Sequence, residues 1–296
     1  MVNTIIHIGF PKTGTTWFQQ QLFPNLSGVN YINKEATNKL IINIPALEFK
    51  KEKIIDVFDD LKTSRPLLLS SEKIVGTFNR GWMNGYFPKQ NAQKLKDIFE
   101  QAEIIVFLRR QQDAISSAYQ QYVKNGGNYS IDRYIHNTST GLFHLDHLKY
   151  HLILDYYADL FGMKNLHIYL FEEFKNDPQQ FTRTFLYDLN ITSNIDKVSF
   201  EPINESPGRW AIIPLKILNA FFYKTYPHKY YITPIPFIEL ITKKIATSHH
   251  FGKKVSTQSL LGANNLQYLE DYYKESNNIL LTKYNLNAIK KHNYSL

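Results

Sequence analysis

The feature that most limits the fold of this chain is an alternation of short apolar runs with longer periodic segments. Runs rich in Ile, Leu or Val, each followed by a polar turn, are typical of strands buried on both faces. Four such runs occur: Thr4–Ile8, Pro66–Leu69, Ile104–Leu108 and Leu166–Leu170. Helical patterns follow them: Thr16–Leu22, Ala92–Ala102, Asp113–Tyr122, His147–Phe161, Pro178–Leu189 and Leu266–Tyr284. Strands that alternate with helices predict an α/β fold of three layers, in which helices flank a central, mostly parallel sheet.

Residues 1–296 are expected to form a single domain that carries an insertion, rather than two domains, and no internal repeat or low-complexity segment is evident. The pattern becomes irregular between about residues 204 and 251, where prolines and aromatic residues gather and acids are few. We interpret this stretch as an insertion that frames the substrate, since such insertions often build variable binding walls. Its aromatic residues could stack on sugar rings or belong to the core: Tyr223, Tyr226, Tyr230, Tyr231 and Phe237.

Composition excludes several classes of function. The chain has no cysteine, which excludes disulfides, thiolate metal sites and cysteine nucleophiles. The net charge of +8 indicates anionic partners, and scattered basic residues favour a charged small ligand over nucleic acid. The longest apolar stretches are interrupted and fall short of the roughly 18–20 residues that a membrane-spanning helix needs. We therefore expect a cytoplasmic protein that contacts a membrane at its surface at most and does not bind nucleic acid.

The first predicted strand leads directly into a loop, residues 9–17, with the sequence GFPKTGTTW. A strand, a glycine-containing loop and a helix start are the arrangement whose backbone N–H groups bind phosphate. Gly9 and Gly14 have the Walker A spacing, but the lysine is Lys12, inside the loop, and Thr15 stands where a Walker A lysine would be. Lys12 is therefore better placed for a bridging oxygen or a transferred group than for the outer phosphates of a nucleoside triphosphate. The alternative is an ordinary strand–helix turn with an exposed lysine.

The PKTGTTW string resembles the 5′-phosphosulfate loop of the sulfotransferases that use 3′-phosphoadenosine 5′-phosphosulfate (PAPS). The resemblance implies a P-loop-like fold, PAPS as co-substrate and no metal ion. It also implies a set of cofactor-binding residues in the loop: Pro11, Lys12, Thr13, Gly14, Thr15, Thr16 and Trp17.

A second signature of that family follows a later strand: an arginine, an acid four residues on, a serine eight on and a tyrosine ten on. Arg109, Asp113, Ser117 and Tyr119 stand at these offsets. The resemblance implies that Arg109 and Ser117 bind the 3′-phosphate of the cofactor, a role that suits the fork of a guanidinium. Arg110 could take the place of Arg109. The alternative is a surface arginine and a serine that faces its own helix.

Two shorter matches extend the resemblance. Phe171 begins a segment similar to the family's Tyr-Glu-Asp, whose aromatic residue lies near the adenine, although Phe171 could equally be core. The string Gly252-Lys253-Lys254, followed by a helix, resembles the loop that closes over the 3′-phosphate. It implies that Lys253 and Lys254 bind the cofactor, but two lysines after a glycine are also common on protein surfaces.

Sulfuryl transfer needs a base for the acceptor hydroxyl and positive charge for the departing phosphate. Glu72 follows the second predicted strand and resembles the glutamate base of carbohydrate-type members of the family, so the catalytic residues implied are Lys12 and Glu72. The alternatives are a Glu72 that caps the next helix and a histidine base, with His144 and His147 as the first candidates.

Two further histidine patterns have simpler explanations. His144, His147 and His151 recur at helical spacing without carboxylates in phase, so no metal site is expected. His7 lies inside the first predicted strand, so we expect it to be part of the core.

The resemblance as a whole implies a PAPS-dependent sulfotransferase of the bacterial, carbohydrate-sulfotransferase type. Its acceptor would be a hydroxyl of a cell-surface carbohydrate or glycolipid precursor, with a small hydroxylated metabolite or lipid as the alternative. The rival enzyme is a nucleotide kinase or NTPase with a degenerate P-loop. A rival of another class is a non-catalytic nucleotide- or glycan-binding protein on the same fold.

Overall fold

The computed structural model describes residues 4–61, 65–76, 78, 88–136, 144–201, 203, 208–222, 241, 244–245 and 254–296. The chain divides into two compact units. Unit 1 comprises Met1–Thr77, Tyr86–Arg109 and Tyr150–Ile203, and unit 2 comprises Phe78–Gly85, Arg110–Lys149 and Asn204–Leu296. The expectation of a single domain over residues 1–296 stays a prediction.

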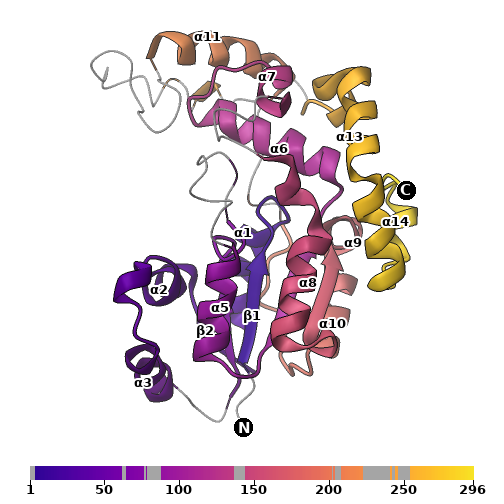
Figure 1. Cartoon of the computed structure of the whole chain (residues 1–296). Coiled ribbons are helices and arrows are strands. Elements are labelled where there is room, and N and C mark those ends of the chain that lie inside the picture. Colours follow the sequence, from indigo (N-terminus) through magenta and orange to yellow (C-terminus); the bar gives the residue numbers. More distant parts are fainter. Residues whose placement is uncertain are drawn as a thin grey trace. The chain divides into compact units, whose positions relative to one another are not determined.

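Unit 1 is built on a five-stranded sheet in which all neighbouring strands run parallel (Figure 1). The strands are β1 (Thr4–Gly9), β2 (Asn30–Ile32), β3 (Leu67–Ser70), β4 (Glu103–Leu108) and β5 (Leu166–Leu170). Their order is β2-β3-β1-β4-β5, which confirms the predicted α/β class. The sequence did not predict β2, because a strand of three residues is too short to give an apolar run. Since β3 and β4 flank β1, the residues that follow these three strands meet at one edge of the sheet.

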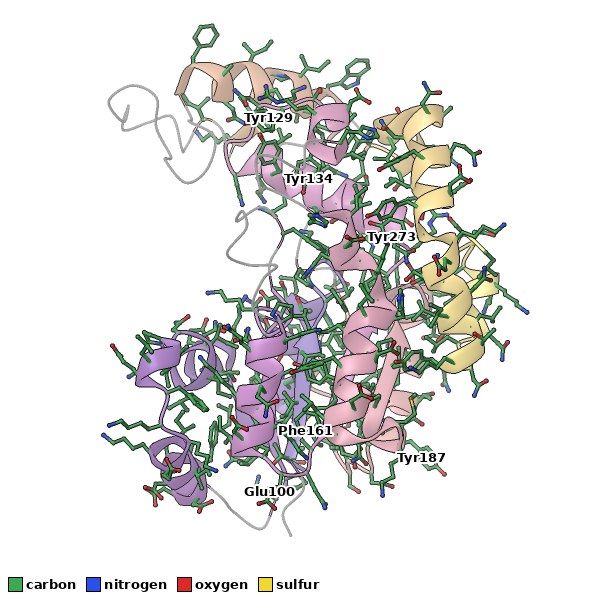
Figure 2. All side chains as sticks on the ribbon, viewed as in Figure 1. Glu100, Tyr129, Tyr134, Phe161, Tyr187 and Tyr273 are labelled. Carbon is green, nitrogen blue, oxygen red and sulfur yellow. The ribbon has the colours of Figure 1, made fainter. Side chains whose placement is uncertain are left out.

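Helices cover both faces of this sheet, so the predicted three layers are confirmed. On one face, Ile5, Ile105 and Phe107 pack against Phe18 and Phe185, with further aromatic residues in the same cluster. On the other face α8 (Tyr150–Phe161) lies against β4 and β5, and α5 (Pro88–Ile98) lies against α8. The Lys96 ammonium of α5 sits 5.3 Å from the ring centroid of Phe161, which Figure 2 labels.

The remaining helical segments of unit 1 connect these layers. They are α1 (Thr15–Trp17), η1 (Phe18–Leu22), η2 (Phe23–Asn25), α2 (Lys34–Thr37), η3 (Asn38–Ile42), η4 (Ala46–Glu48), α3 (Lys51–Leu61), η7 (Met163–Asn165), α9 (Phe171–Asn176) and α10 (Pro178–Asp188). The predicted start of α10 is confirmed, because Pro178 opens the helix and the side chain of Asp177 accepts a hydrogen bond from the amide of Gln180.

Unit 2 is helical in its described residues. Its elements are α6 (Gln111–Lys124), α7 (Ile131–His136), η6 (Leu145–Leu148), η8 (Arg209–Ala211), α11 (Ile212–Phe222), α13 (Thr257–Lys283) and α14 (Ala288–Lys291). Both α11 and α13 pack against α6 (Figure 1). Tyr134 of α7, labelled in Figure 2, is buried against Tyr119 and Tyr122 of α6.

Part of the predicted insertion at 204–251 is described, and it contains α11. The aromatic residues interpreted there as sugar-stacking groups lie outside the described residues: Tyr223, Tyr226, Tyr230, Tyr231 and Phe237. Lys253 lies outside them as well. Among the helices that the structure describes, none is both long enough and apolar enough to cross a bilayer.

Candidate functional site

The loop after β1 follows a backbone path that its two glycines make possible. Gly9 has φ 117° and Gly14 has φ 79°, in a region that residues with a Cβ rarely adopt. Neighbouring groups also approach both glycines closely, so that an added Cβ would be tightly packed. One added at Gly9 would lie 3.2 Å from the Cα of Glu72, and one at Gly14 would lie 3.1 Å from the Cε2 of Phe171. The loop is therefore in close contact with both Glu72 and Phe171.

Some of the predicted cofactor-binding residues give the loop its shape. Thr13 is buried, and its hydroxyl donates a hydrogen bond of 2.5 Å to the carbonyl of Phe10. Trp17 is buried as well: its indole N–H donates to the carbonyl of Ser199 at 2.8 Å, and its ring packs 4.7 Å from that of Phe174. These contacts fix the direction in which the chain leaves β1.

The other predicted residues of the loop differ in how far they reach solvent. Lys12, Gly14 and Thr16 are half-buried, while Pro11 and Thr15 are buried. Lys12 has φ 68°, so its backbone lies in the left-handed region as well. Whether any of these residues contacts a cofactor stays a prediction.

Arg109, the first residue after β4, lies against this loop. Its guanidinium donates to the carbonyl of Lys12 at 2.8 Å and lies 4.9 Å from the ring centroid of Phe171. The Tyr150 hydroxyl donates to the Arg109 carbonyl at 2.6 Å and so anchors the backbone. The structure therefore brings together Arg109, the loop and Phe171 from three separate sequence matches.

Arg110 has a different partner. Its Nε donates to Oδ2 of Asp113 at 2.8 Å, three residues along the same helix. Asp113 also accepts a hydrogen bond from the hydroxyl of Thr257. Arg109 is bonded to the loop by the hydrogen bond to the Lys12 carbonyl, which supports it as the candidate phosphate-binding residue. That role stays a prediction.

Glu72 occupies the turn after β3, and its carboxylate is held by two side chains. One oxygen pairs with the ammonium of Lys34, at the start of α2, and the other accepts from Nε2 of Gln19 at 3.1 Å. Burial acts to raise the pKa of Glu72, whose side chain is 14% exposed. The charge and hydrogen bond of Lys34, with the hydrogen bond of Gln19, outweigh burial and lower that pKa below its usual value.

Behind Glu72 the polar contacts continue into the sheet. Nε2 of Gln19 also donates to the hydroxyl of Ser70 at 3.1 Å, and Ser70 bonds to Nδ1 of His7 at 2.8 Å. His7 is buried among Phe18, Phe23 and Phe107, which confirms that it is part of the core. Burial lowers its pKa to about 4, while the charge of Glu72 acts to raise it. Within the described part of the chain, Nε2 of His7 has no hydrogen-bond partner.

Sequence reasoning missed Lys34 and Gln19. Lys34 follows the short strand β2, which gives no sequence signal, and Gln19 lies on η1, just after the phosphate-loop motif. The only hint for Lys34 is Asn33, an N-cap residue whose side chain accepts from the amide of Ala36.

The remaining predicted residues lie in unit 2. Ser117 is half-buried on α6, and Lys254 is exposed and forms an isolated bridge with Gly208. Their positions relative to the loop stay a prediction. His144 pairs with Asp146 at 3.6 Å, and no group of three possible metal ligands occurs among the described residues.

Comparisons with known proteins concern the fold. No protein-family model and no curated protein matches the chain. Among solved structures, a sulfotransferase from Alicyclobacillus acidocaldarius is 19% identical with a TM-score of 0.48, over 68% of this chain and 87% of that one. Mouse sulfotransferase SULT7A1 complexed with PAP is 12% identical with a TM-score of 0.48, over 100% of this chain and 90% of that one.

A third match is the sulfotransferase domain from the curacin biosynthetic pathway. It is 14% identical with a TM-score of 0.38, over 68% of this chain and 76% of that one. All three structures carry the name sulfotransferase. At these identities and TM-scores the matches carry no conclusion about activity, which must come from the residues of the site.

Proposed function

We propose that this protein is a sulfotransferase that moves the sulfuryl group of PAPS to a hydroxyl of an acceptor. The observation that carries the proposal is the position of three groups around one loop. Lys12 lies inside the loop, Arg109 is bonded to its backbone at 2.8 Å, and Glu72 lies directly against Gly9 at its start. These residues come from three separate sequence matches to one family and from the ends of three adjacent strands.

The donor set suits an anionic nucleotide that carries sulfate. The loop and the Arg109 guanidinium offer N–H donors and positive charge to phosphate oxygens. The ring of Phe171, which closes against Gly14, offers a flat apolar surface for a base. Ser117, Lys253 and Lys254 would complete the contacts to the 3′-phosphate, as the resemblance implies.

PAPS supplies an activated sulfuryl group, and the chain's own residues then manage charge and the proton. The acceptor oxygen forms a bond to sulfur while the bond from sulfur to the phosphate oxygen breaks, and the electron pair leaves with that oxygen. Glu72 takes the proton of the acceptor hydroxyl. Lys12 provides positive charge where negative charge develops on the departing phosphate. No metal ion is needed for this sequence of events.

The rival proposal of a kinase or NTPase finds less support. Such a site requires a lysine after the second glycine of the loop and an aspartate at a strand end that binds magnesium, whereas the second to fourth predicted strands lead into Ser70, Arg109 and Phe171. Thr15 stands at the lysine position and is only 6% exposed. The non-catalytic rival differs only in whether sulfate moves, so it must be tested by activity.

We propose a cell-surface carbohydrate or glycolipid precursor as the acceptor, and the cytoplasm, at the membrane surface, as the location. The support for this choice is five aromatic residues of the 204–251 stretch, since flat rings stack on sugars: Tyr223, Tyr226, Tyr230, Tyr231 and Phe237.

The test uses PAPS labelled in its sulfate, the full chain and glycan acceptors, with and without a chelator. Transfer of label that survives the chelator is expected. Calorimetry should show binding of 3′-phosphoadenosine 5′-phosphate (PAP) without magnesium. Tight, magnesium-dependent binding of ATP would favour the kinase, and PAP binding without any transfer would favour the non-catalytic protein.

A further inference from the structure

One face of α11 carries an exposed apolar stripe. Trp210, Ile213, Ile217 and Phe221 are spaced by three or four residues, which places them on one side of η8 and α11. Their exposed fractions are 62%, 63%, 56% and 62%, in that order. Isolated exposed apolar residues are ordinary, but a contiguous row of large ones marks an interaction surface.

The opposite face of the same helix is fixed in the interior of unit 2. Leu215 and Asn219 are buried there, and α11 packs along α6 (Figure 1). The Nδ2 group of Asn219 donates to the carbonyls of Val123 and Gly127, both at 2.8 Å. These two hydrogen bonds set the rotation of the helix, so the stripe cannot turn inward. A helix that is apolar on all sides is normally buried, and here half of it remains exposed.

The stretch of sequence that contains this helix is strongly one-sided in charge. Lysines and arginines are spread along the whole chain, but the acidic residues avoid this segment. Between residues 206 and 269 there are eight basic residues and one acidic residue, which accounts for nearly all of the net charge of +8. Residues 206–238 contain no acid at all. Lys216 lies within α11, and Arg209 and Lys224 flank the stripe in the sequence.

We propose that the α11 stripe docks on the surface of a bilayer that contains anionic lipid. Large apolar side chains, a tryptophan and neighbouring basic residues are the combination that holds a helix in the plane of a membrane interface. Basic residues near the surface add attraction to anionic head groups. An 11-residue helix is about 17 Å long, too short to cross the hydrocarbon core, so it lies along the surface.

A second copy of this chain fits the stripe less well. Two copies that met through α11 would bring two basic segments together, and like charges at an interface oppose binding. An anionic surface complements the same charge. The inference makes the proposed location at a membrane surface specific. The four stripe residues have no assigned role in binding PAPS or in moving the proton, so vesicle binding and sulfuryl transfer can fail independently of each other.

The experiment is sedimentation of the full chain with vesicles. One set is phosphatidylcholine alone, and in the other phosphatidylglycerol replaces about a third of it. Binding to the anionic set is expected, weakening as NaCl rises from about 0.05 to 0.5 M. The variant Ile217→Ser/Phe221→Ser should lose at least about tenfold in partition coefficient. The control Leu152→Ser/Tyr187→Ser removes apolar residues that are 50% and 83% exposed in unit 1, and it should bind as the wild type does.

Tryptophan emission gives a second measurement. Trp210 should shift to shorter wavelength when anionic vesicles are added, and Trp210→Phe should remove the shift. Circular dichroism and PAP calorimetry show whether each variant is folded. Equal vesicle binding by a folded stripe variant and by the wild type would overturn the proposal. So would a wild type that binds no vesicle, or a stripe variant that converts a dimer to a monomer, since the stripe would then join copies of the chain.

Discussion

The carboxylate of Glu72 and the ammonium of Lys34 form an ion pair between two neighbouring strand ends, since Lys34 follows β2 and Glu72 follows β3. A buried carboxylate alone would have a raised pKa, and this cation reverses the shift. The proposed base is therefore ionised over a wider range of pH, at the cost of some basicity. Lys34 therefore affects how readily Glu72 accepts a proton.

Glu72→Gln should cut turnover by about a hundredfold or more, because general base catalysis is typically worth about 10²–10⁴-fold. The amide keeps the size of the side chain and can still accept from Gln19, so the pocket should survive. PAP affinity, measured by calorimetry, should be nearly unchanged. Glu72→Asp is the matched control and should retain part of the activity. Near-normal turnover in Glu72→Gln would refute the assignment of the base.

Lys34→Met should change the pH dependence of turnover. The rate of a base-dependent reaction falls as pH drops through the pKa of the base. Without the Lys34 charge, burial dominates and raises the pKa of Glu72, so the acid limb should move to higher pH. Lys34→Arg restores the charge and should move the limb back. If Lys34 is only structural, Lys34→Met should lower the rate equally at every pH.

Arg109→Ala should weaken PAP binding by tenfold to a hundredfold, since a lost hydrogen bond to a charged group costs about 1.5–3 kcal/mol. Ser117→Ala should act in the same direction. Both losses should disappear with a nucleotide that lacks the 3′-phosphate. Arg110→Ala is the comparison, because Arg110 is the alternative phosphate-binding residue and its Nε is paired with Asp113. Equal losses with both nucleotides would mean that Arg109 merely supports the loop through the Lys12 carbonyl.

Gly14→Ala is compared with Gly262→Ala, since both glycines have positive φ, 79° and 74°. Gly14 has ψ 8°, in the left-handed region, where an alanine costs about 1–2 kcal/mol. Gly262 has ψ 165°, in a region essentially restricted to glycine, so the backbone cost of its alanine is at least as large. A Cβ at Gly14 would meet the Phe171 ring at 3.1 Å, whereas one at Gly262 would meet nothing within 4 Å. Both variants should therefore lose stability in urea unfolding, but only Gly14→Ala should also lose PAP affinity. Equal PAP affinities in the two variants would show that the ring contact is irrelevant to the nucleotide.

The elements that the sequence predicts correctly are those encoded by a local pattern, such as an apolar run or an N-cap residue followed by proline. Runs such as Ile104–Leu108 have to be buried on both faces, and Asp177 with Pro178 has to open a helix, so these elements are where the sequence places them. The strand β2 was missed because three residues are too few to show an apolar run or an alternation of apolar and polar residues. Its pairing with β3 is a tertiary contact that no local pattern encodes.

The same distinction applies to the candidate site. Lys12 and Arg109 sit in strings with fixed spacing, and the structure brings them within one hydrogen bond of each other. Lys34 and Gln19 belong to no motif and reach Glu72 only because β2 and η1 lie beside the end of β3. Motifs of fixed spacing predict which residues bind a ligand. Residues such as Lys34 and Gln19, which hold a motif residue in place, reach it through tertiary packing, so a single sequence does not reveal them.

His7 should make the protein lose stability as pH falls. Its pKa is lowered by burial from 6.5 to about 4, so the folded state keeps it neutral while the unfolded state takes up a proton below pH 6.5. The unfolded state then binds more protons, and the free energy of unfolding falls as pH drops through this window. Between pH 6.5 and 5 one such histidine accounts for about 2 kcal/mol. His147, whose pKa burial also lowers to about 4, acts in the same direction.

Urea unfolding at several pH values measures this slope, and His7→Gln removes one titrating group while keeping a side chain that can bond to Ser70. The variant will differ from the wild type in absolute stability, so the comparison is between slopes. The slope between pH 6.5 and 5 should be smaller in His7→Gln and should fall again when His147→Gln is added. Glu72, whose charge acts on His7, has a pKa below its usual value and therefore below this window. An unchanged slope in His7→Gln would mean that His7 becomes protonated in the folded protein, and its unbonded Nε2 would then have to reach water or an acceptor.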